Sequence, residues 1–424
     1  GLCVQYGEGT EASVEEAQGW YTKAAEGGQA AAQYAQAAFL MGSTELANNE
    51  KAGEAIQWLQ KAAAQDFMLA YHRLSDIYRI GLGVEPSNEK AAEWLRKASK
   101  AGDALGSYRL GQMFESGVAD GEPNAGTALK YYELAAERGS AEAMVYLGRL
   151  YETGAQGKVD LAKALEYYRM ADKKGAPEAR YRLGRLYQFG VGVDADPERA
   201  MFYYRKGAEQ GNAGCIFQVG QCYATGTGVE KSLGDAAGWY RKGAEAGHPA
   251  SFYNLGVMHR DGLGGLSKSD EKAFAFFVRA GELGDNTAQN VLGGMYHRGM
   301  PPVQVDNTAA VAWFSRAADA GFSAAMINLG LMYENGTGVG RDFAVAGSFY
   351  QQGAGKGNPA GFYHLGRLLE SGRGVRPNLV QAYVCYVQGA KFSEEATKAR
   401  DLLKAKLSKE QIADVEKALK ELAK

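Results

Sequence analysis

The chain has 424 residues, of which 46% are hydrophobic and 23% charged, a length that suits two or three globular domains or one long repeat array. Its 47 Lys and Arg residues nearly balance its 49 Asp and Glu residues, so net charge favours neither nucleic acid nor an anionic membrane as a partner. No apolar run reaches the roughly 18 to 20 residues that a membrane-spanning helix needs. We therefore expect a soluble chain without membrane insertion.

An aromatic pair recurs along the whole sequence, from Trp20-Tyr21 to Cys385-Tyr386, at spacings of 36 to 38 residues. Such small variation in length is typical of one backbone unit repeated about eleven times, so we expect one extended array without internal linkers. The intervening pairs are Trp58-Leu59, Trp94-Leu95, Tyr131-Tyr132, Tyr167-Tyr168, Tyr203-Tyr204, Trp239-Tyr240, Phe276-Phe277, Trp313-Phe314 and Phe349-Tyr350.

The unit at residues 176–211 shows how each repeat is built. Apolar residues recur at helical spacing from Ala179 to Tyr187, which predicts a first helix, helix A, that ends at the glycines of residues 190–193. Asp196-Pro197 then predicts the start of helix B, with Asp as N-cap and Pro at the first helical position. Helix B ends at Gly211 and the next unit follows at once, so consecutive helices should pack antiparallel.

A glycine recurs in the middle of helix A. Glycine inside a helix costs about 0.5 to 1 kcal/mol relative to Ala, whereas burying one aromatic side chain stabilises by several kcal/mol at about 25 cal/mol/Å². The recurrence therefore predicts that two helices approach closely there. The glycines are Gly111, Gly148, Gly184, Gly220, Gly256, Gly293, Gly330 and Gly366.

The pattern Leu-Gly-x-x-Tyr, Gly-x-Gly-Val, an aromatic pair, Ala and a closing Gly resembles the Sel1-like repeat family, relatives of the tetratricopeptide repeat. Residues 183–211, 219–247 and 329–357 carry it well, and the resemblance covers residues 2 to about 392. It implies a right-handed superhelix of helix pairs that acts as an adaptor in protein assemblies and catalyses no reaction. Ser75 in place of the helix A glycine and Cys385 in place of an aromatic depart from the pattern.

Residues 393–424 leave the repeat and predict two capping helices, because solenoids need polar-faced ends. Ser408 and Gln411 have the spacing of a capping box at the start of the second helix. The two expected apolar stripes are Ala396, Ala399, Leu402 and Leu403, then Ile412, Val415, Leu419 and Leu422. The predicted fold is an all-α, right-handed superhelical solenoid of about eleven antiparallel helix pairs over residues 1–392, the first incomplete, with a C-terminal helical cap over residues 393–424.

The four cysteines do not suggest disulfides. Cys215 and Cys222 are seven residues apart on one predicted helix, about 10.5 Å along its axis, which is too far for a bridge. We expect all four, including Cys3 and Cys385, to be buried apolar residues, which favours the cytoplasm. Gly1 opens within a repeat, so we expect natural residues before it, and this leaves a periplasmic or secreted location open.

Several motifs suggest chemistry that their context does not support. The Gly-x-Gly motifs, such as Gly190-Val191-Gly192, follow a helix and lack the third glycine or the Gly-Lys-Ser/Thr ending of phosphate loops, so we expect no nucleotide or other cofactor. His259 and His297 lie in neighbouring units but without a cluster of metal ligands, so we expect packing or interface roles and no metal. Asn335-Gly336-Thr337 matches a glycosylation site but is interpreted as a helix-ending turn. The carboxylates that recur at one helix A position are expected to be solvated groove residues: Glu115, Glu152, Glu334 and Glu370.

Two hypotheses for function follow. The first is a non-enzymatic adaptor that binds another protein or peptide in the concave groove lined by helix A. The second is a regulatory or targeting region of a longer protein with a catalytic or signalling domain upstream of residue 1. An enzyme would require a nucleophile, a base and an orienting group, and these residues do not supply such a set.

In tetratricopeptide geometry, the positions two before and two after the helix A leucine line the inner face. The position before holds an aromatic in several repeats, which favours packing over partner contact. The position after holds one adjacent basic pair, Arg149 and Arg185, expected on neighbouring helices and suited to an acidic peptide. Alternatively, Arg149 pairs with Glu152 on the same helix. The candidate groove residues are Arg149, Arg185, Tyr181, Tyr253, Arg260 and Arg367.

Overall fold

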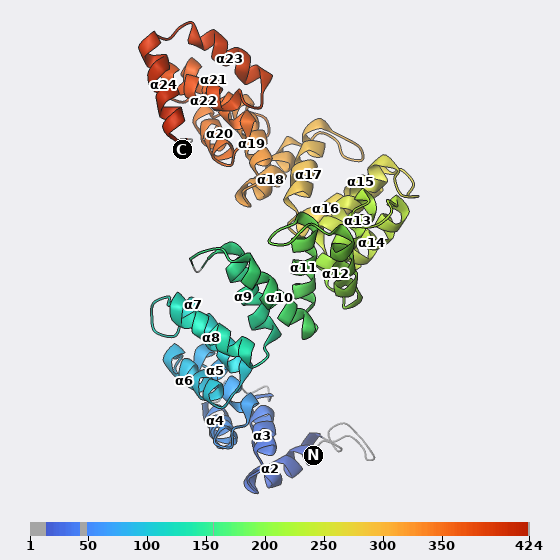
Figure 1. Cartoon of the computed structure of the whole chain (residues 1–424), viewed down its shortest axis with the longest axis vertical. Helices are drawn as coiled ribbons and strands as arrows, with labels where there is room; N and C mark the ends of the chain where they lie inside the picture. Colours follow the sequence, from blue (N-terminus) through green and yellow to red (C-terminus); the bar gives the residue numbers. More distant parts are fainter. Residues whose placement is uncertain (1–13, 43–48, 156, 423–424) are drawn as a thin grey trace. The chain divides into compact units, whose positions relative to one another are not determined.

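The computed structural model describes residues 14–42, 49–155 and 157–422 (Figure 1). This part of the chain forms 23 helices, α2 to α24, and contains no β-strand. The helices belong to two compact units, Gly1–Gly207 and Ala208–Lys424. The boundary between the units lies inside α12 (Pro197–Glu209), and each unit is described by itself.

Within each unit, most consecutive helices pack against one another. The first unit contains α2 (Val14–Glu26), α3 (Ala30–Gly42), α4 (Asn49–Ala63), α5 (Met68–Ile80), α6 (Asn88–Lys100), α7 (Ala104–Glu115), α8 (Ala125–Glu137), α9 (Ala141–Thr153), α10 (Leu161–Lys173), α11 (Pro177–Phe189) and most of α12. The second unit continues with α13 (Ala213–Thr225), α14 (Leu233–Glu245), α15 (Pro249–Asp261), α16 (Asp270–Glu282), α17 (Asn286–Arg298), α18 (Asn307–Asp319), α19 (Ser323–Asn335), α20 (Phe343–Gly355), α21 (Pro359–Ser371), α22 (Leu379–Gly389), α23 (Glu394–Lys404) and α24 (Lys409–Leu422). The A helices of the repeats are the odd-numbered helices α3 to α21, and the B helices are the even-numbered helices α2 to α22.

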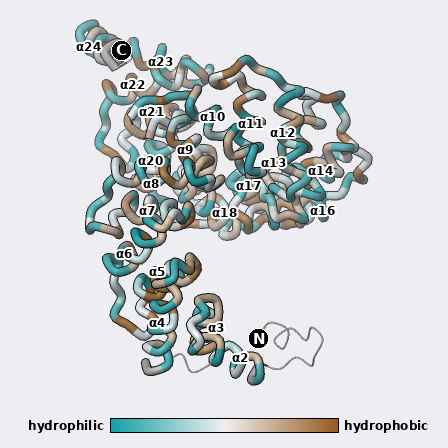
Figure 2. Tube along the Cα trace, turned by 60° about the horizontal axis from the view of Figure 1, so that its bottom comes forward, coloured by the Kyte–Doolittle hydropathy of each residue, from teal (hydrophilic) through white to brown (hydrophobic). Residues whose placement is uncertain are grey.

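Local signals set the ends of the helices as predicted. Helix α11 ends at Phe189, and Gly190 follows with φ of 66°, the left-handed conformation that glycine adopts at little cost. Asp196 caps α12, because its Oδ1 accepts a hydrogen bond of 2.9 Å from the backbone N–H of Arg199. Hydrophobic and hydrophilic residues alternate in short stretches along the helices in Figure 2, as expected when one face of each helix is buried.

The second residue of the aromatic pair forms the core of each repeat. Tyr168 is fully buried, and a Cβ atom added to Gly148 on the preceding A helix would lie 2.5 Å from Cε1 of its ring. The same ring-against-glycine contact recurs at all eight helix A glycines, so the predicted close approach is confirmed. Ser75 fits in place of glycine because its partner Leu95 has no ring, and both are buried.

The first residue of the aromatic pair packs on its own A helix. The Tyr131 ring stacks on Phe114 with centroids 5.4 Å apart and planes 5° apart, and Tyr203 stacks on Tyr187 at 5.7 Å and 8°. The repeats of Tyr131 and Tyr203 therefore join their two helices by two aromatic contacts, one with a ring against glycine and one with parallel rings.

The C-terminal helices begin as predicted. The Ser408 backbone N–H donates to Gln411 Oε1 at 2.9 Å, and the Gln411 N–H donates to Ser408 Oγ at 3.1 Å, which is the predicted capping box. Leu403 and Val415 are buried in one apolar cluster with α22. The prediction for Leu402 is wrong, because it is 71% exposed. It lies about 100° around the helix from Leu403, so the two side chains cannot face the same core.

We predict that deleting residues 393–424 causes aggregation. The deletion would remove Leu403 and Val415 from the apolar cluster that contains Tyr383, Cys385 and Tyr386, and so expose these buried side chains. Static light scattering on the truncated and full chains measures the effect. A truncated chain that stays monodisperse at the same concentration would contradict a capping role.

The cysteines that the structure describes are buried. Burial raises the pKa of the Cys222 and Cys385 thiols to about 11, so both are protonated and unreactive at neutral pH. Cys215 and Cys222 lie on one helix, α13, as expected, and Cys3 lies outside the described residues. No helix within those residues is long and apolar enough to cross a membrane.

Candidate functional site

The recurring helix A carboxylates have a structural role that the sequence analysis did not anticipate. Each lies four residues after the helix A glycine and accepts a hydrogen bond from the buried tyrosine of helix B in the same repeat. The donor-to-acceptor distances are 2.8 Å for Tyr132 to Glu115, 2.6 Å for Tyr168 to Glu152, 2.7 Å for Tyr350 to Glu334 and 3.0 Å for Tyr386 to Glu370. Gln188 accepts from Tyr204 in the same way, at 2.8 Å.

We call each such pair a tyrosine–acceptor pair and its helix A position the acceptor position. The expectation that these carboxylates are solvated groove residues is wrong: the Glu334 side chain, for example, is only 10% exposed. The physical reason is that a buried phenolic hydroxyl needs an acceptor, and the carboxylate supplies it.

The environment of these tyrosines keeps them protonated at neutral pH. Burial, and then the hydrogen bond to Glu152, raises the pKa of Tyr168 far above its ordinary value. Tyr146 also donates to Glu115, and burial followed by this hydrogen bond raises the pKa of Tyr146 to about 12. Each phenol therefore acts as a fixed hydrogen-bond donor.

Four repeats lack the tyrosine hydroxyl, and three of them have a basic residue at the acceptor position. In these three repeats the tyrosine is replaced by Leu95, Phe277 and Phe314, and the matching acceptor positions hold Arg79, Arg260 and His297, in the same order. In the fourth, Leu59 replaces the tyrosine and Met41 holds the acceptor position. The Tyr240 hydroxyl finds its acceptor at a different helix A position, because it donates to Gln221 Oε1 at 2.9 Å. The joint change at these two columns of the repeat is a sequence signal that links the two positions, and the structure shows that the link is a hydrogen bond.

The aromatic residues two before the helix A leucine pack against helix B. The ring centroid of Tyr181 lies 6.4 Å from that of Tyr204, and Tyr253 lies 5.6 Å from Phe277. Both candidates are half-buried. Their contacts agree with the packing interpretation and leave one edge of each ring accessible.

Arg149 lies in a hollow of about 570 Å³ in the first unit. Its guanidinium is exposed and lies 4.9 Å from the centre of the Tyr146 ring. It forms no ion pair with any residue that the structure describes, and Glu152 accepts from Tyr168 instead, so the expected alternative pair is not formed. The other polar and aromatic residues of this Arg149 hollow are Tyr108, Glu142, Tyr146, Lys174, Glu178 and Arg182.

Arg149 and Arg185 lie on α9 and α11, the A helices of successive repeats, but Arg185 does not line the hollow. Arg182, one turn earlier on α11, lines it instead and pairs with Glu178 at 2.9 Å. The basic partner of Arg149 within the hollow is Lys174, which is exposed and likewise without an ion pair among the described residues.

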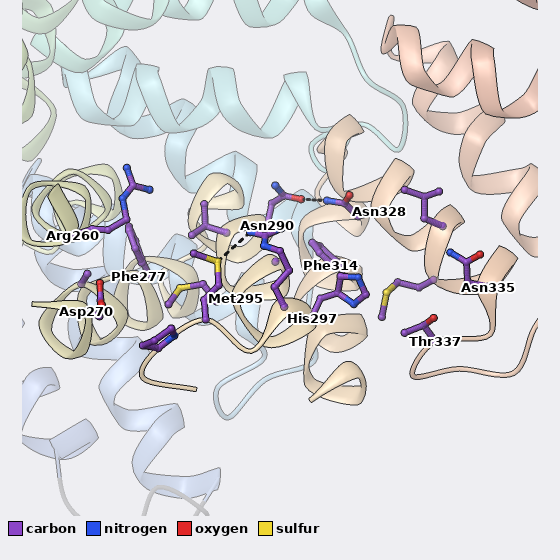
Figure 3. A pocket seen from close by; sticks show the side chains of 18 residues that line it. Arg260, Asp270, Phe277, Asn290, Met295, His297, Phe314, Asn328, Asn335 and Thr337 are labelled. Atoms are coloured by element: carbon purple, nitrogen blue, oxygen red, sulfur yellow. Dashed lines mark hydrogen bonds between the residues drawn. The ribbon is translucent and has the colours of Figure 1, made fainter. Parts of the chain in front are cut away.

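Arg260 lies in the second unit, in a pocket of about 390 Å³ between α15, α17 and α19. Figure 3 shows Arg260 and Asp270 at one end of this pocket, Asn335 and Thr337 at the other, and Met295 between them. We call it the Arg298 pocket, after a further basic residue of its lining.

The last candidate, Arg367, is engaged by its own repeat and the one before. Its guanidinium lies 5.9 Å from the centre of the Tyr363 ring and forms an ion pair of 3.4 Å with Glu334. The side chain remains exposed. Arg367 is the exposed member of this pair, and Glu334 keeps its hydrogen bond from Tyr350 if Arg367 turns to a partner carboxylate.

The two histidines considered as metal ligands have separate partners. The buried His259 ring stacks on Phe276 at 5.5 Å, and Nδ1 of His297 lies 2.8 Å from Oδ1 of Asn307. Across the described ranges, no group of three His, Cys, Asp or Glu side chains is placed to hold a metal ion. Gly336 takes the left-handed conformation after α19, with φ of 70°, as the turn interpretation of Asn335-Gly336-Thr337 requires.

A family model for the Sel1 repeat matches eleven consecutive stretches of the chain. They are residues 1–29, 28–67, 69–103, 104–140, 141–175, 177–212, 213–248, 250–285, 287–322, 323–358 and 363–391. The chain belongs to the Sel1 repeat family. This confirms the resemblance and the all-α solenoid of about eleven helix pairs predicted from the sequence, and Sel1 repeat solenoids commonly serve as protein-interaction scaffolds.

Two solved structures of Sel1 repeat proteins are similar over most of the chain. One is a protective antigen present in uropathogenic Escherichia coli strains, with 28% identity, a TM-score of 0.59, and coverage of 98% of this chain and 88% of the other. The second is a Sel1 repeat protein from Oxalobacter formigenes, with 27% identity, a TM-score of 0.57, and coverage of 77% and 94%. Among curated proteins no match was found.

Proposed function

We propose that this Sel1 repeat protein is a non-enzymatic adaptor that binds an acidic segment of another protein through the Arg149 hollow. The observation that carries the proposal is the pair of exposed cations, Arg149 and Lys174, in one hollow beside half-buried tyrosines and without acidic partners among the described residues. A stable fold does not require such charges to converge, whereas an acidic ligand would pair with both.

The surrounding groups suit a peptide. Tyr108 and Tyr146 offer aromatic edges 6.4 Å apart by their centroids, and Pro177 adds an apolar surface. Glu142 and Glu178 also line the hollow, and Glu178 is engaged by Arg182. A partner that places a carboxylate between Arg149 and Lys174 and an apolar group on the tyrosines would match this arrangement.

We predict that Arg149→Gln with Lys174→Gln weakens partner binding at least tenfold, or about 1.4 kcal/mol, with an unchanged thermal midpoint. A photo-crosslinking residue at position 145, which lines the hollow, identifies the partner, and calorimetry with the purified partner measures affinity. The matched control is Lys173→Gln with Arg185→Gln, which removes the same charge from residues on α10 and α11 that do not line the hollow. Equal affinities for both double variants would contradict the proposal.

A further inference from the structure

We infer that the Arg298 pocket in the second unit binds a carboxylate carried next to an apolar side chain in a peptide. The inference rests on the proposed adaptor function, because it assigns a second recognition site and its ligand chemistry. It concerns a different unit from the Arg149 hollow, so the two can fail separately.

The pocket forms where two successive repeats have lost their tyrosine–acceptor pairs. Phe277 and Phe314 replace the tyrosines, Arg260 and His297 replace the carboxylates, and all four line this one pocket. In the following repeat the pair is intact, with Tyr350 donating to Glu334. A guanidinium and an imidazole thus replace two carboxylates in adjacent repeats, which removes two negative charges that the pattern would place here and adds the positive charge of Arg260.

The pocket floor is apolar and adaptable. Met295 and Met332 are buried beside Phe277 and Phe314, and Leu331 adds a branched side chain. Methionine side chains adjust to ligands of different shape through their flexible thioethers. A volume of about 390 Å³ is near the lower end of ligand pockets, so it suits one or two peptide side chains.

The donors at the rim select an anion. Arg298 is exposed, and its guanidinium donates to Met300 Sδ at 3.3 Å and forms no ion pair in the described part of the chain. Asn328 donates to Asn290 Oδ1 at 2.9 Å (Figure 3), so this hydrogen bond does not use the amide N–H₂ group of Asn290, which also lines the pocket. A guanidinium and an amide together match the two oxygens of a carboxylate.

The acidic residues nearby limit the charge of the ligand. Arg260 is held by Asp261 through two hydrogen bonds of 2.8 Å, and Asp270 also lines the pocket. Arg298 is the guanidinium of the lining without an ion pair among the described residues, and a single unpaired cation favours a monoanionic carboxylate over a doubly charged phosphate. The carboxylate could come from a chain terminus or from an acidic side chain.

Three fluorescein-labelled peptides separate these sources by fluorescence anisotropy. The first ends in Ser-Leu-Leu with a free carboxylate, the second is its C-terminal amide, and the third ends in Ser-Leu-Glu amide. We expect at least one carboxylate peptide to bind at least tenfold more tightly than the amide. Equal binding of all three, or no binding of any at millimolar concentration, would overturn the inference. Neither result would bear on the proposal for the Arg149 hollow, which is tested separately.

Variants locate the binding. Arg298→Gln should weaken the binding of the tighter carboxylate peptide at least tenfold. The control Arg316→Gln, on α18 outside the pocket lining, should leave that affinity unchanged. The double variant Phe314→Tyr with His297→Glu would restore a tyrosine–acceptor pair. This variant should therefore keep the thermal midpoint of the unchanged protein but no longer bind the peptide. An Arg298→Gln variant that binds like Arg316→Gln would show that the pocket does not recognise the carboxylate.

Discussion

Above pH 10 this protein is expected to lose stability steeply, because its buried tyrosines must keep their protons in the folded state. Burial is the largest cause and the hydrogen bond to a carboxylate the next, and together they raise the pKa of Tyr132, Tyr168, Tyr350 and Tyr386 well above the ordinary value of 10. Burial also raises the pKa of Tyr240.

The sign of the effect follows from linkage. A group whose pKa is raised by folding contributes stability that is fully present below its unfolded pKa, here about 10, and is lost as the pH rises above it. Each fully buried tyrosine removes up to about 1.4 kcal/mol per pH unit in this range. Tyr240, Tyr350 and Tyr386 lie in the second unit, so that unit should lose roughly 4 kcal/mol per pH unit above about pH 11.

Circular dichroism and tyrosinate absorbance, followed together from pH 8 to 12, measure this loss. The buried tyrosines should ionise only as the helices unfold. Tyr350→Phe should reduce the loss in the free energy of unfolding per pH unit by the contribution of one tyrosine. Ionisation of all tyrosines near pH 10 with full helicity retained would contradict the prediction.

Gly293→Ala is expected to destabilise the second unit by about 1 to 2 kcal/mol. The added Cβ would lie 2.6 Å from two ring carbons of Phe314, which is itself only 3% exposed and cannot move aside. Overpacking of this kind costs about 1 to 3 kcal/mol, and the gain of about 0.5 to 1 kcal/mol from replacing a helical glycine offsets part of it. Urea unfolding followed by circular dichroism gives the difference in the free energy of unfolding.

A glycine elsewhere in the same unit provides the control. Gly238, in the middle of α14, has no atom within 4 Å of an added Cβ, so Gly238→Ala should stabilise by about 0.5 to 1 kcal/mol. Gly293→Ser with Phe314→Leu copies the natural combination of Ser75 and Leu95 and should cost less than the sum of its single changes. The prediction fails if the two glycine-to-alanine changes have the same sign.

The structure also changes which residues are expected to meet a partner. Arg149 lines the hollow together with Lys174 and Arg182, whereas Arg185 does not. Arg182 and Arg185 are about one turn apart on α11, and only the side chain of Arg182 reaches the hollow. Arg260 lines a pocket, although the position rule that selected Arg149 does not select it. Its signal was the absence of a hydroxyl on Phe277, which is 17 residues away in sequence.

The sequence by itself determined the repeat, the helix ends and the contact between ring and glycine. These depend on interactions within a few residues, such as Asp196 capping α12 and Ser408 with Gln411 at α24, or on a pattern repeated about eleven times. Only the tertiary structure decided that Glu334 serves Tyr350, that Leu402 is exposed and that Arg298 shares a pocket with Arg260. Each of these depends on the rotation of one helix against another, which is fixed by side-chain packing over the whole repeat and not by any local residue pattern.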